Sequence, residues 1–229
     1  IQYAGGFKPA NRAWLPLGPY LRHGKEIIEL PKADSGCRPQ ILPDLGPIDG
    51  LPLVPQPQSW TPAEGVLEVS GFVCDRAAFE SVAALAARRG WSFVGDTEVS
   101  VEAADLPEDA YELEISEDGV TLRAGDFGGE FYGAITLLTL LQHSALPCGV
   151  IKDAPRFAWR GQHLDTARHY YEPQTILDLL DLMALLKFNR FHWHFADDEA
   201  FRLEIECFPE LWQKTAICGE GHLLPALFS

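Results

Sequence analysis

Residues 161–198 decide the fold, and they read GQHLDTARHY YEPQTILDLL DLMALLKFNR FHWHFADD. Gly161–Thr166 and Arg190–Phe195 have the short, apolar or aromatic character of strands. Between them, Pro173 takes the first position of a predicted helix, where a backbone N–H would lack a partner anyway. Four apolar residues then follow helical spacing and predict a stripe that faces the core: Ile176, Leu179, Leu180 and Met183. Strand, crossover helix and strand together predict one right-handed parallel βαβ unit.

Charged side chains follow both predicted strands, at the edge where α/β enzymes place their sites. Asp165 and Arg168 come after the first strand, and Asp197 and Asp198 end the second. An arginine at this edge suits a carboxylate, a phosphate or a sugar diol, because its planar fork donates to two oxygens at once. A purely structural Arg–Asp ion pair at the rim of the sheet would give the same pattern. Spacing alone is compatible with both interpretations.

Histidines form a second candidate group. His192 and His194 are alternate residues of one strand and therefore share a face. They could form a metal site completed by His163 and the aspartates. The other interpretation is that they pack inside a barrel wall, each hydrogen-bonded to a neighbour. We favour packing, because no third ligand follows at a defined spacing, and we predict neither a metal ligand nor a cofactor.

The region from about residue 51 to residue 147 has an α+β pattern. Val66–Val73 is predicted as a strand and Arg76–Arg89 as a helix closed by Gly90. Tyr111–Ala124 alternates apolar with polar residues on both sides of an Asp-Gly turn, which predicts a hairpin. A second helix is predicted over Glu130–His143. The sequence therefore places a separate α+β domain before the βαβ unit.

Proline marks the first part of the chain. Ten of the 17 prolines lie within the first 57 residues, and proline resists both helix and central strand. Residues 1–50 are therefore predicted to be a linker or the tail of an upstream domain, with one short strand at Glu26–Leu30. No signal peptide is visible after Ile1, which we interpret as a non-native N-terminus, and a cytoplasmic or periplasmic location is favoured.

The composition excludes two classes of partner. The net charge of −15 argues against nucleic acid, since binding to phosphate needs clustered basic side chains. No apolar stretch reaches the roughly 18 residues of a membrane span, so no membrane partner is expected. Five scattered cysteines never form a C-x-x-C pair and are interpreted as buried or free thiols: Cys37, Cys74, Cys148, Cys207 and Cys218.

A series of motifs in the second half of the chain resembles one known family. In order, they are Asp153-Ala-Pro-Arg-Phe157, Trp159-Arg-Gly161, Leu164-Asp-Thr-Ala-Arg-His-Tyr170, Leu186-Lys-Phe-Asn189, His192-Trp-His194, Asp197-Asp198, Arg202-Leu-Glu-Ile205 and Phe208-Pro-Glu-Leu211. Together they resemble the N-terminal part of the β-N-acetylhexosaminidases of glycoside hydrolase family 20. Upstream, Tyr111–Ala124 resembles a hairpin of that family's accessory domain, and Gly129-Glu-Phe-Tyr-Gly133 with Thr136-Leu-Leu138 resembles its final helix.

The resemblance implies a fold and an activity. The fold is an α+β accessory domain over residues 51–150, followed at 151–229 by the first two β/α units of a (β/α)₈ TIM barrel. The activity is exo-acting removal of terminal β-linked N-acetylglucosamine or N-acetylgalactosamine from glycans or chitooligosaccharides. Family members retain the anomeric configuration and use the substrate's own acetamido oxygen as the nucleophile, an exception to the paired-carboxylate scheme.

The resemblance also implies roles for single residues. Arg168 matches the arginine that holds the sugar 3- and 4-hydroxyls, and Asp197 matches an active-site aspartate. Asp165, His194 and Asp198 match positions that support this geometry.

The catalytic acid and its aspartate neighbour are implied to lie beyond Ser229, on a later strand, so Asp197-Asp198-Glu199 is not that pair. Residues 151–229 are too few for a barrel of about 250 residues, which makes the missing remainder of the barrel an implied partner. Two other functions stay open: a non-catalytic glycan-binding protein on the same scaffold, and a metal-dependent barrel hydrolase that uses His192 and His194.

Overall fold

The computed structural model describes residues 20–23, 26–29, 51–142, 145–198 and 200–215. The chain divides into two units, Ile1–Asp49 and Gly50–Ser229. In the first, β1 (Tyr20–His23) pairs with β2 (Glu26–Glu29) as an antiparallel hairpin. A strand was predicted there from Glu26, and its existence is confirmed. The other residues of the predicted linker, 1–50, lie outside the described residues.

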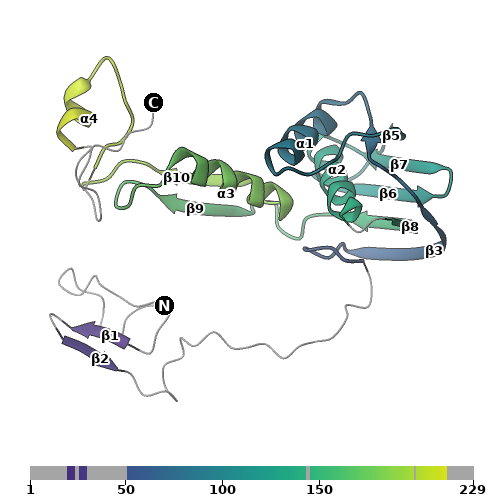
Figure 1. The fold of residues 1–229 in the computed structure, drawn as a ribbon, viewed down its shortest axis with the longest axis horizontal. Coiled ribbons are helices and arrows are strands. Elements are labelled where there is room, and N and C mark those ends of the chain that lie inside the picture. Colours follow the sequence, from purple (N-terminus) through teal and green to yellow (C-terminus); the bar gives the residue numbers. More distant parts are fainter. Residues whose placement is uncertain (1–19, 24–25, 30–50, 143–144, 199, 216–229) are drawn as a thin grey trace. The chain divides into compact units, whose positions relative to one another are not determined.

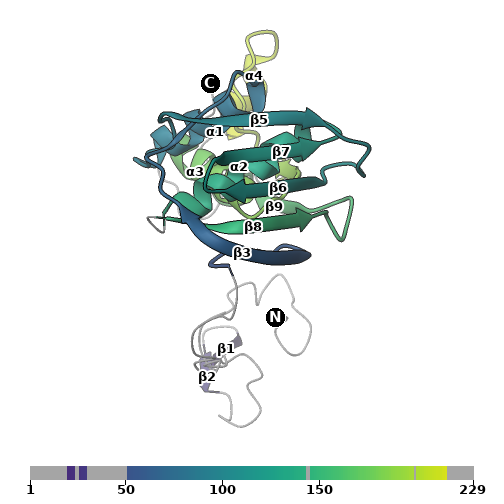
Figure 2. The same ribbon diagram turned by 90° about the vertical axis from the view of Figure 1, so that its right-hand side faces the viewer.

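The second unit begins with a six-stranded mixed sheet in the order β3-β8-β6-β7-β5-β4 (Figures 1 and 2). Its strands are β3 (Ser59–Leu67), β4 (Phe72–Val73), β5 (Thr97–Ala103), β6 (Tyr111–Ser116), β7 (Gly119–Ala124) and β8 (Leu146–Asp153). The first four strands of that order are antiparallel, and β5 and β4 continue the sheet in parallel. Helices α1 (Ala77–Arg88) and α2 (Phe127–Leu141) cover one face of this sheet (Figure 2).

The predicted hairpin is confirmed, because period-2 patterning and turn chemistry act locally. Tyr111, Leu113 and Ile115 of β6 are buried while the residues between them are less so. Helix α2 packs closely on this face: a Cβ at Gly133 would lie 2.4 Å from a methyl carbon of Leu122. Glycine at this position therefore allows the helix and the sheet to approach each other.

Two predicted boundaries in this domain are wrong. The strand predicted at Val66–Val73 is two strands, β3 and β4, which lie at opposite edges of the sheet. Gly71 lies between the two strands, where φ is +156° and a Cβ would lie 2.7 Å from the carbonyl oxygen of Phe93. The second helix begins at Phe127 rather than Glu130, because the Asp126 side chain caps it by accepting the Gly129 N–H at 2.7 Å. His143, its predicted end, lies outside the described residues.

The predicted βαβ unit is confirmed. Strand β9 (Gly161–Asp165) pairs in parallel with β10 (Arg190–His194), and α3 (Pro173–Leu185) connects them. Pro173 is the first residue of α3, as predicted. The predicted core-facing stripe of this helix is only partly confirmed, since Ile176 and Met183 are buried but Leu180 is 37% exposed. The short helix α4 (Pro209–Thr215) follows.

Within the described residues, β9 and β10 pair only with each other, so no closed barrel forms. The apolar face of α3 therefore has only a two-stranded sheet to cover among the described residues. No described helix is long and apolar enough to cross a membrane. Cys74, Cys148 and Cys207 are free thiols, as predicted, and Cys37 and Cys218 lie outside the described residues.

Polar contacts join the six-stranded domain to the βαβ unit. Arg88 of α1 donates to the buried carboxylate of Asp181 on α3 at 2.6 Å. Arg160, just before β9, forms an ion pair with Asp109 at 2.9 Å. Both partners of the second pair are largely buried, so the contact also orders the start of β9.

Candidate functional site

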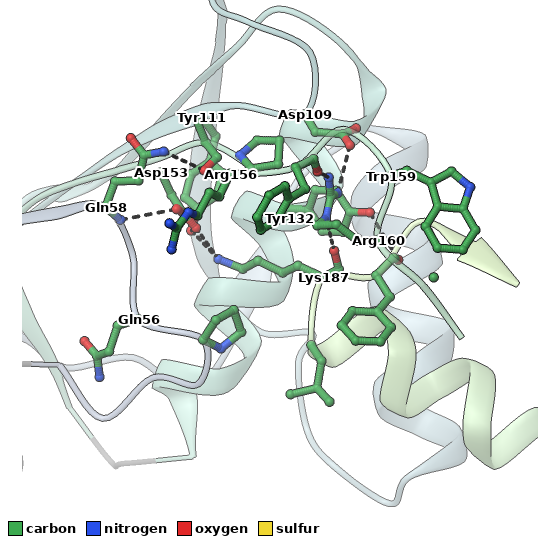
Figure 3. A pocket seen from close by; sticks show the side chains of 17 residues that line it. Gln56, Gln58, Asp109, Tyr111, Tyr132, Asp153, Arg156, Trp159, Arg160 and Lys187 are labelled. Carbon is green, nitrogen blue, oxygen red and sulfur yellow. Dashed lines mark hydrogen bonds and ion pairs between the residues drawn. The ribbon is translucent and has the colours of Figure 1, made fainter. Parts of the chain in front are cut away.

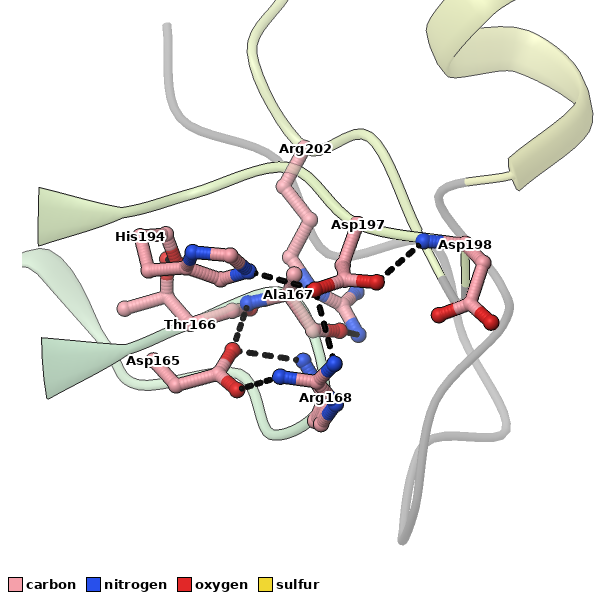
Figure 4. A network of polar contacts seen from close by, with 8 residues as sticks. All are labelled: Asp165, Thr166, Ala167, Arg168, His194, Asp197, Asp198 and Arg202. Atoms are coloured by element: carbon pink, nitrogen blue, oxygen red, sulfur yellow. Dashed lines mark hydrogen bonds and ion pairs between the residues drawn. The ribbon is translucent and has the colours of Figure 1, made fainter.

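The charged residues that follow β9 and β10 meet at one edge of the strand pair (Figure 4). Arg168 Nη1 lies 2.7 Å from Asp165 Oδ2, and Arg168 Nη2 lies 2.7 Å from Asp197 Oδ2. His194 Nε2 is 2.6 Å from the same Asp197 oxygen. The parallel pairing explains this juxtaposition, because His194 is in register with Asp165 and the carboxyl ends of parallel strands meet at one edge.

The turn after β9 is shaped by Asp165. Its Oδ1 accepts the backbone N–H groups of Ala167 and Arg168, both at 3.0 Å, which is a side-chain-supported turn. Burial alone would raise the pKa of Asp165, but the backbone and guanidinium hydrogen bonds from Arg168 outweigh it and lower the pKa. Asp165 is therefore an anion that fixes both the backbone and the side chain of Arg168.

Asp197 is held as an anion as well. Hydrogen bonds from Asp198, including its backbone N–H at 2.7 Å, lower the pKa of Asp197. The hydrogen bond from His194 and the charge of Arg168 lower it further. The Asp198 carboxylate itself points away from Arg168 (Figure 4). Asp198 therefore helps to hold Asp197 as an anion, and Glu199 lies outside the described residues.

The arrangement contains the Arg–Asp ion pair that the structural interpretation predicts. The Arg168 side chain is nevertheless 51% exposed, while its two carboxylate partners are about four-fifths covered. A planar, always-charged fork is thus held in a fixed orientation at the surface of the strand pair. Such a fork suits ligands with adjacent oxygens, including vicinal hydroxyls.

Sequence reasoning missed the role of Arg202, which is fully buried. Its Nε donates to the Thr166 carbonyl at 2.7 Å and its Nη2 to the Ala167 carbonyl at 3.0 Å (Figure 4). Trp193 adds a hydrogen bond from its indole N–H to Thr166 Oγ1 at 2.8 Å. The sequence held no local signal for this role, because the two carbonyls lie 36 and 35 residues before Arg202 and meet it only in the folded chain.

The three candidate histidines also come together. His192 lies directly opposite His163 across the strand pair, with ring centroids 4.6 Å apart. His194 completes the group, and the candidate ligand nitrogens of all three lie within 4.8 Å of one another. Sequence spacing did not supply the third histidine at a defined distance, because its position depends on the register of two strands.

A cavity of about 690 Å³ lies elsewhere, between the six-stranded domain and the start of β9 (Figure 3). Neither Arg168 nor Asp197 lines it. Lys187 extends along its wall and donates to Asp153 at 2.6 Å and to the Tyr111 hydroxyl at 2.8 Å. Burial lowers the pKa of Lys187, and the attraction of Asp153 partly opposes this. Because Lys187 is paired with Asp153 and Arg160 with Asp109, we interpret this cavity as part of the domain junction.

The site can now be compared with known proteins. Residues 50–154 match domain 2 of glycosyl hydrolase family 20, and residues 157–222 match the catalytic domain of the same family. The chain belongs to glycosyl hydrolase family 20. The resemblance noted in the sequence is thereby confirmed, as is the order of a domain 2 followed by the start of a catalytic domain.

Several family 20 proteins are similar to this chain. The β-hexosaminidase of Akkermansia muciniphila is 39% identical over 115 residues, which are 48% of this chain and 23% of the relative. The N,N'-diacetylchitobiase of Vibrio harveyi is 36% identical over 175 residues, or 69% of this chain and 20% of the relative. The chain therefore spans about a fifth of the length of these relatives.

Solved structures lead to the same family. A family 20 exo β-N-acetylglucosaminidase from Vibrio harveyi, in complex with N-acetylglucosamine, superimposes with a TM-score of 0.64 at 28% identity. The match covers 78% of this chain and 30% of that one. A second family 20 β-N-acetylglucosaminidase gives a TM-score of 0.65 at 30% identity, over 77% of this chain and 37% of that one.

Proposed function

We propose that the full-length protein carrying this chain is an exo-acting β-N-acetylhexosaminidase. It hydrolyses terminal β-linked N-acetylglucosamine or N-acetylgalactosamine, with glycans or chitooligosaccharides as substrates. The family 20 matches over residues 50–154 and 157–222 support this, as do relatives named β-hexosaminidase and chitobiase. The neighbour solved with N-acetylglucosamine supports the same class of sugar.

The observation that carries the proposal is that two carboxylates hold the guanidinium of Arg168 in place. In the proposed complex, Arg168 binds the 3- and 4-hydroxyls of the terminal sugar, and Asp197 lies beside it in the same site. Asp165 and Asp197 hold the guanidinium at 2.7 Å each, so the fork is ordered before substrate arrives. Preorganised donors lose little conformational freedom on binding, which favours affinity. His194 and Asp198 support this geometry through Asp197.

The proposed reaction needs no cofactor. The substrate's acetamido oxygen attacks C1, while a glutamic acid protonates the leaving oxygen and an aspartate beside it orients the acetamido group. We place that acid pair beyond Ser229. Asp165 and Asp197, both with lowered pKa, are anions at neutral pH and so are unsuited to act as the proton donor.

The same proposal includes a division of the chain into three parts. Residues 1–50 are a linker or the end of an upstream domain, 51–150 are the α+β accessory domain, and 151–229 are the first two β/α units of a (β/α)₈ barrel. The parallel pair of β9 and β10 with its connecting α3 supports the last part. In such barrels the site lies at the carboxyl ends of the strands, where Arg168 and Asp197 meet.

The test compares two substrates that differ only in the acetamido group. The full-length protein should release p-nitrophenol from the β-N-acetylglucosaminide but not from the β-glucoside, because the glucoside lacks the nucleophile. NMR of the first product formed should show the β anomer. Equal turnover of both substrates would contradict substrate assistance. Binding of the N-acetylglucosaminide without any release would instead support the glycan-binding alternative.

A further inference from the structure

The group of His163, His192 and His194 is the feature that the proposed function leaves unused. His163 and His192 are cross-strand neighbours, and His194 is two residues further along β10. Residues two apart on a strand point to the same face, so all three share the face that carries Asp165. The His163–His192 pair therefore lies two positions before the Asp165–His194 pair, on the same face of the two strands.

The described residues do not form a packed wall around these side chains. His163 and His192 are exposed, and His194 is only partly buried. Within the described part of the chain, the rings of His163 and His192 have no hydrogen-bond partner. Packed histidines are expected to have such partners. Two imidazoles therefore face the same space with nitrogen lone pairs that the described residues do not use.

We propose that His163, His192 and His194 form a binding site for a transition-metal dication of the zinc class. Neutral imidazole is a preferred ligand of Zn²⁺, Cu²⁺ and Ni²⁺. Zn–N bonds of about 2.0–2.1 Å place tetrahedral ligand nitrogens about 3.3 Å apart. The three nitrogens here lie within 4.8 Å of one another. Small side-chain rotations of exposed residues close the remaining gap, and water takes the fourth position.

His194 has a further feature of metal ligands. One of its nitrogens, Nε2, lies 2.6 Å from Asp197 Oδ2, and Figure 4 draws this contact as a dashed line. Metal-binding histidines characteristically donate their second N–H to a carboxylate, which fixes the tautomer and raises the basicity of the ligating nitrogen. In the proposed complex, Nε2–H of His194 donates to Asp197 and Nδ1 binds the metal. Asp197 then acts as the outer partner of the site.

This arrangement links the metal site to the proposed sugar site. A bound dication draws His194 toward His163 and His192, and it changes the charge that Asp197 and Arg168 experience. The metal is not a cofactor in this scheme, so a chelator leaves hydrolysis unchanged. Added metal instead lowers hydrolysis through His194, a consequence that rests on the proposed function.

Metal binding is measured on the chelator-treated full-length protein by calorimetric titration with Zn²⁺ and by visible absorption with Co²⁺. We expect one Zn²⁺ per chain and the intense Co²⁺ bands of a four-coordinate nitrogen site. Loss of an outer-shell partner alone lowers affinity by about 10–100-fold. His163→Gln and His192→Gln should therefore each weaken Zn²⁺ binding at least tenfold. His169→Gln is the matched control and should bind as the wild type does.

Equal Zn²⁺ affinity in His163→Gln and the wild type would overturn the proposal, and so would a Co²⁺ spectrum dominated by thiolate charge transfer. Circular dichroism checks that the variants fold. The titration does not require turnover, so it still decides the metal site if the protein proves not to be a hydrolase. In an active protein, Zn²⁺ should inhibit the wild type and the His169→Gln control but not His163→Gln.

Discussion

Replacing Arg202 by methionine tests how the turn that carries Arg168 is held. Methionine keeps much of the side-chain volume and removes every donor. The lost hydrogen bonds reach the carbonyls of Thr166 at 2.7 Å and Ala167 at 3.0 Å. Because Arg202 is fully buried, these bonds are not exchanged for bonds to water. Bonds to charged groups contribute about 1.5–3 kcal/mol each, so the free energy of unfolding should fall by about 3–6 kcal/mol.

The assay is urea unfolding followed by far-UV circular dichroism. Arg202→Lys keeps the charge but loses the fork, so it should lose about half as much free energy of unfolding. Arg123→Met is the control, since Arg123 forms exposed ion pairs on the outer face of the sheet, where about 0–1 kcal/mol is expected. If Arg202→Met unfolds at the same urea concentration as Arg123→Met, the turn does not depend on Arg202.

Three further predictions concern the domain junction, pH and the isolated chain. Lys187→Met should lower the free energy of unfolding by about 3–5 kcal/mol in urea titrations, because it leaves Asp153 buried without its cation; adding Asp153→Asn should recover part of the loss. Because the pKa of Asp165 and of Asp197 is lowered in the folded state, the stability that they contribute is complete above about pH 4 and is lost as pH falls further. The urea concentration at the midpoint of unfolding, measured between pH 7 and pH 3, should therefore fall below about pH 4. In the double variant Asp165→Asn/Asp197→Asn, this fall should be smaller. The purified 229-residue chain alone should be prone to aggregation and release no p-nitrophenol, since we place the general acid, typically worth 10²–10⁴-fold, beyond Ser229; turnover that Arg168→Ala abolishes would show that the acid lies within it.

Local patterns predicted those parts of the fold whose causes are local. The alternation in Tyr111–Ser116 and the helix start at Pro173 both depend on residues within a few positions of each other. The strand predicted at Val66–Val73 failed because β3 and β4 pair with different neighbours, far away in the sequence. Leu180 has helical spacing, yet it is 37% exposed, because burial depends on which elements pack against α3 and helical spacing does not specify them.

The same distinction applies to the site. Proximity of Arg168 to Asp197 follows from the general geometry of parallel strands, and the structure shows the contact. The contact between His163 and His192 depends on register, which sequence spacing does not specify. Arg202 reaches a carbonyl 35 residues earlier in the chain, so its function appears only once the strands are paired.

The most direct test of the central claim is the kinetics of Arg168→Lys in the full-length protein with p-nitrophenyl β-N-acetylglucosaminide. Lysine keeps the charge but not the fork that we propose binds two sugar hydroxyls. Loss of one charge-assisted hydrogen bond of about 1.5–3 kcal/mol predicts that kcat/KM falls at least about tenfold to a hundredfold. Arg123→Lys should keep the wild-type value. Wild-type kcat/KM in Arg168→Lys would contradict the account and leave the Arg168–Asp197 contact as a structural ion pair.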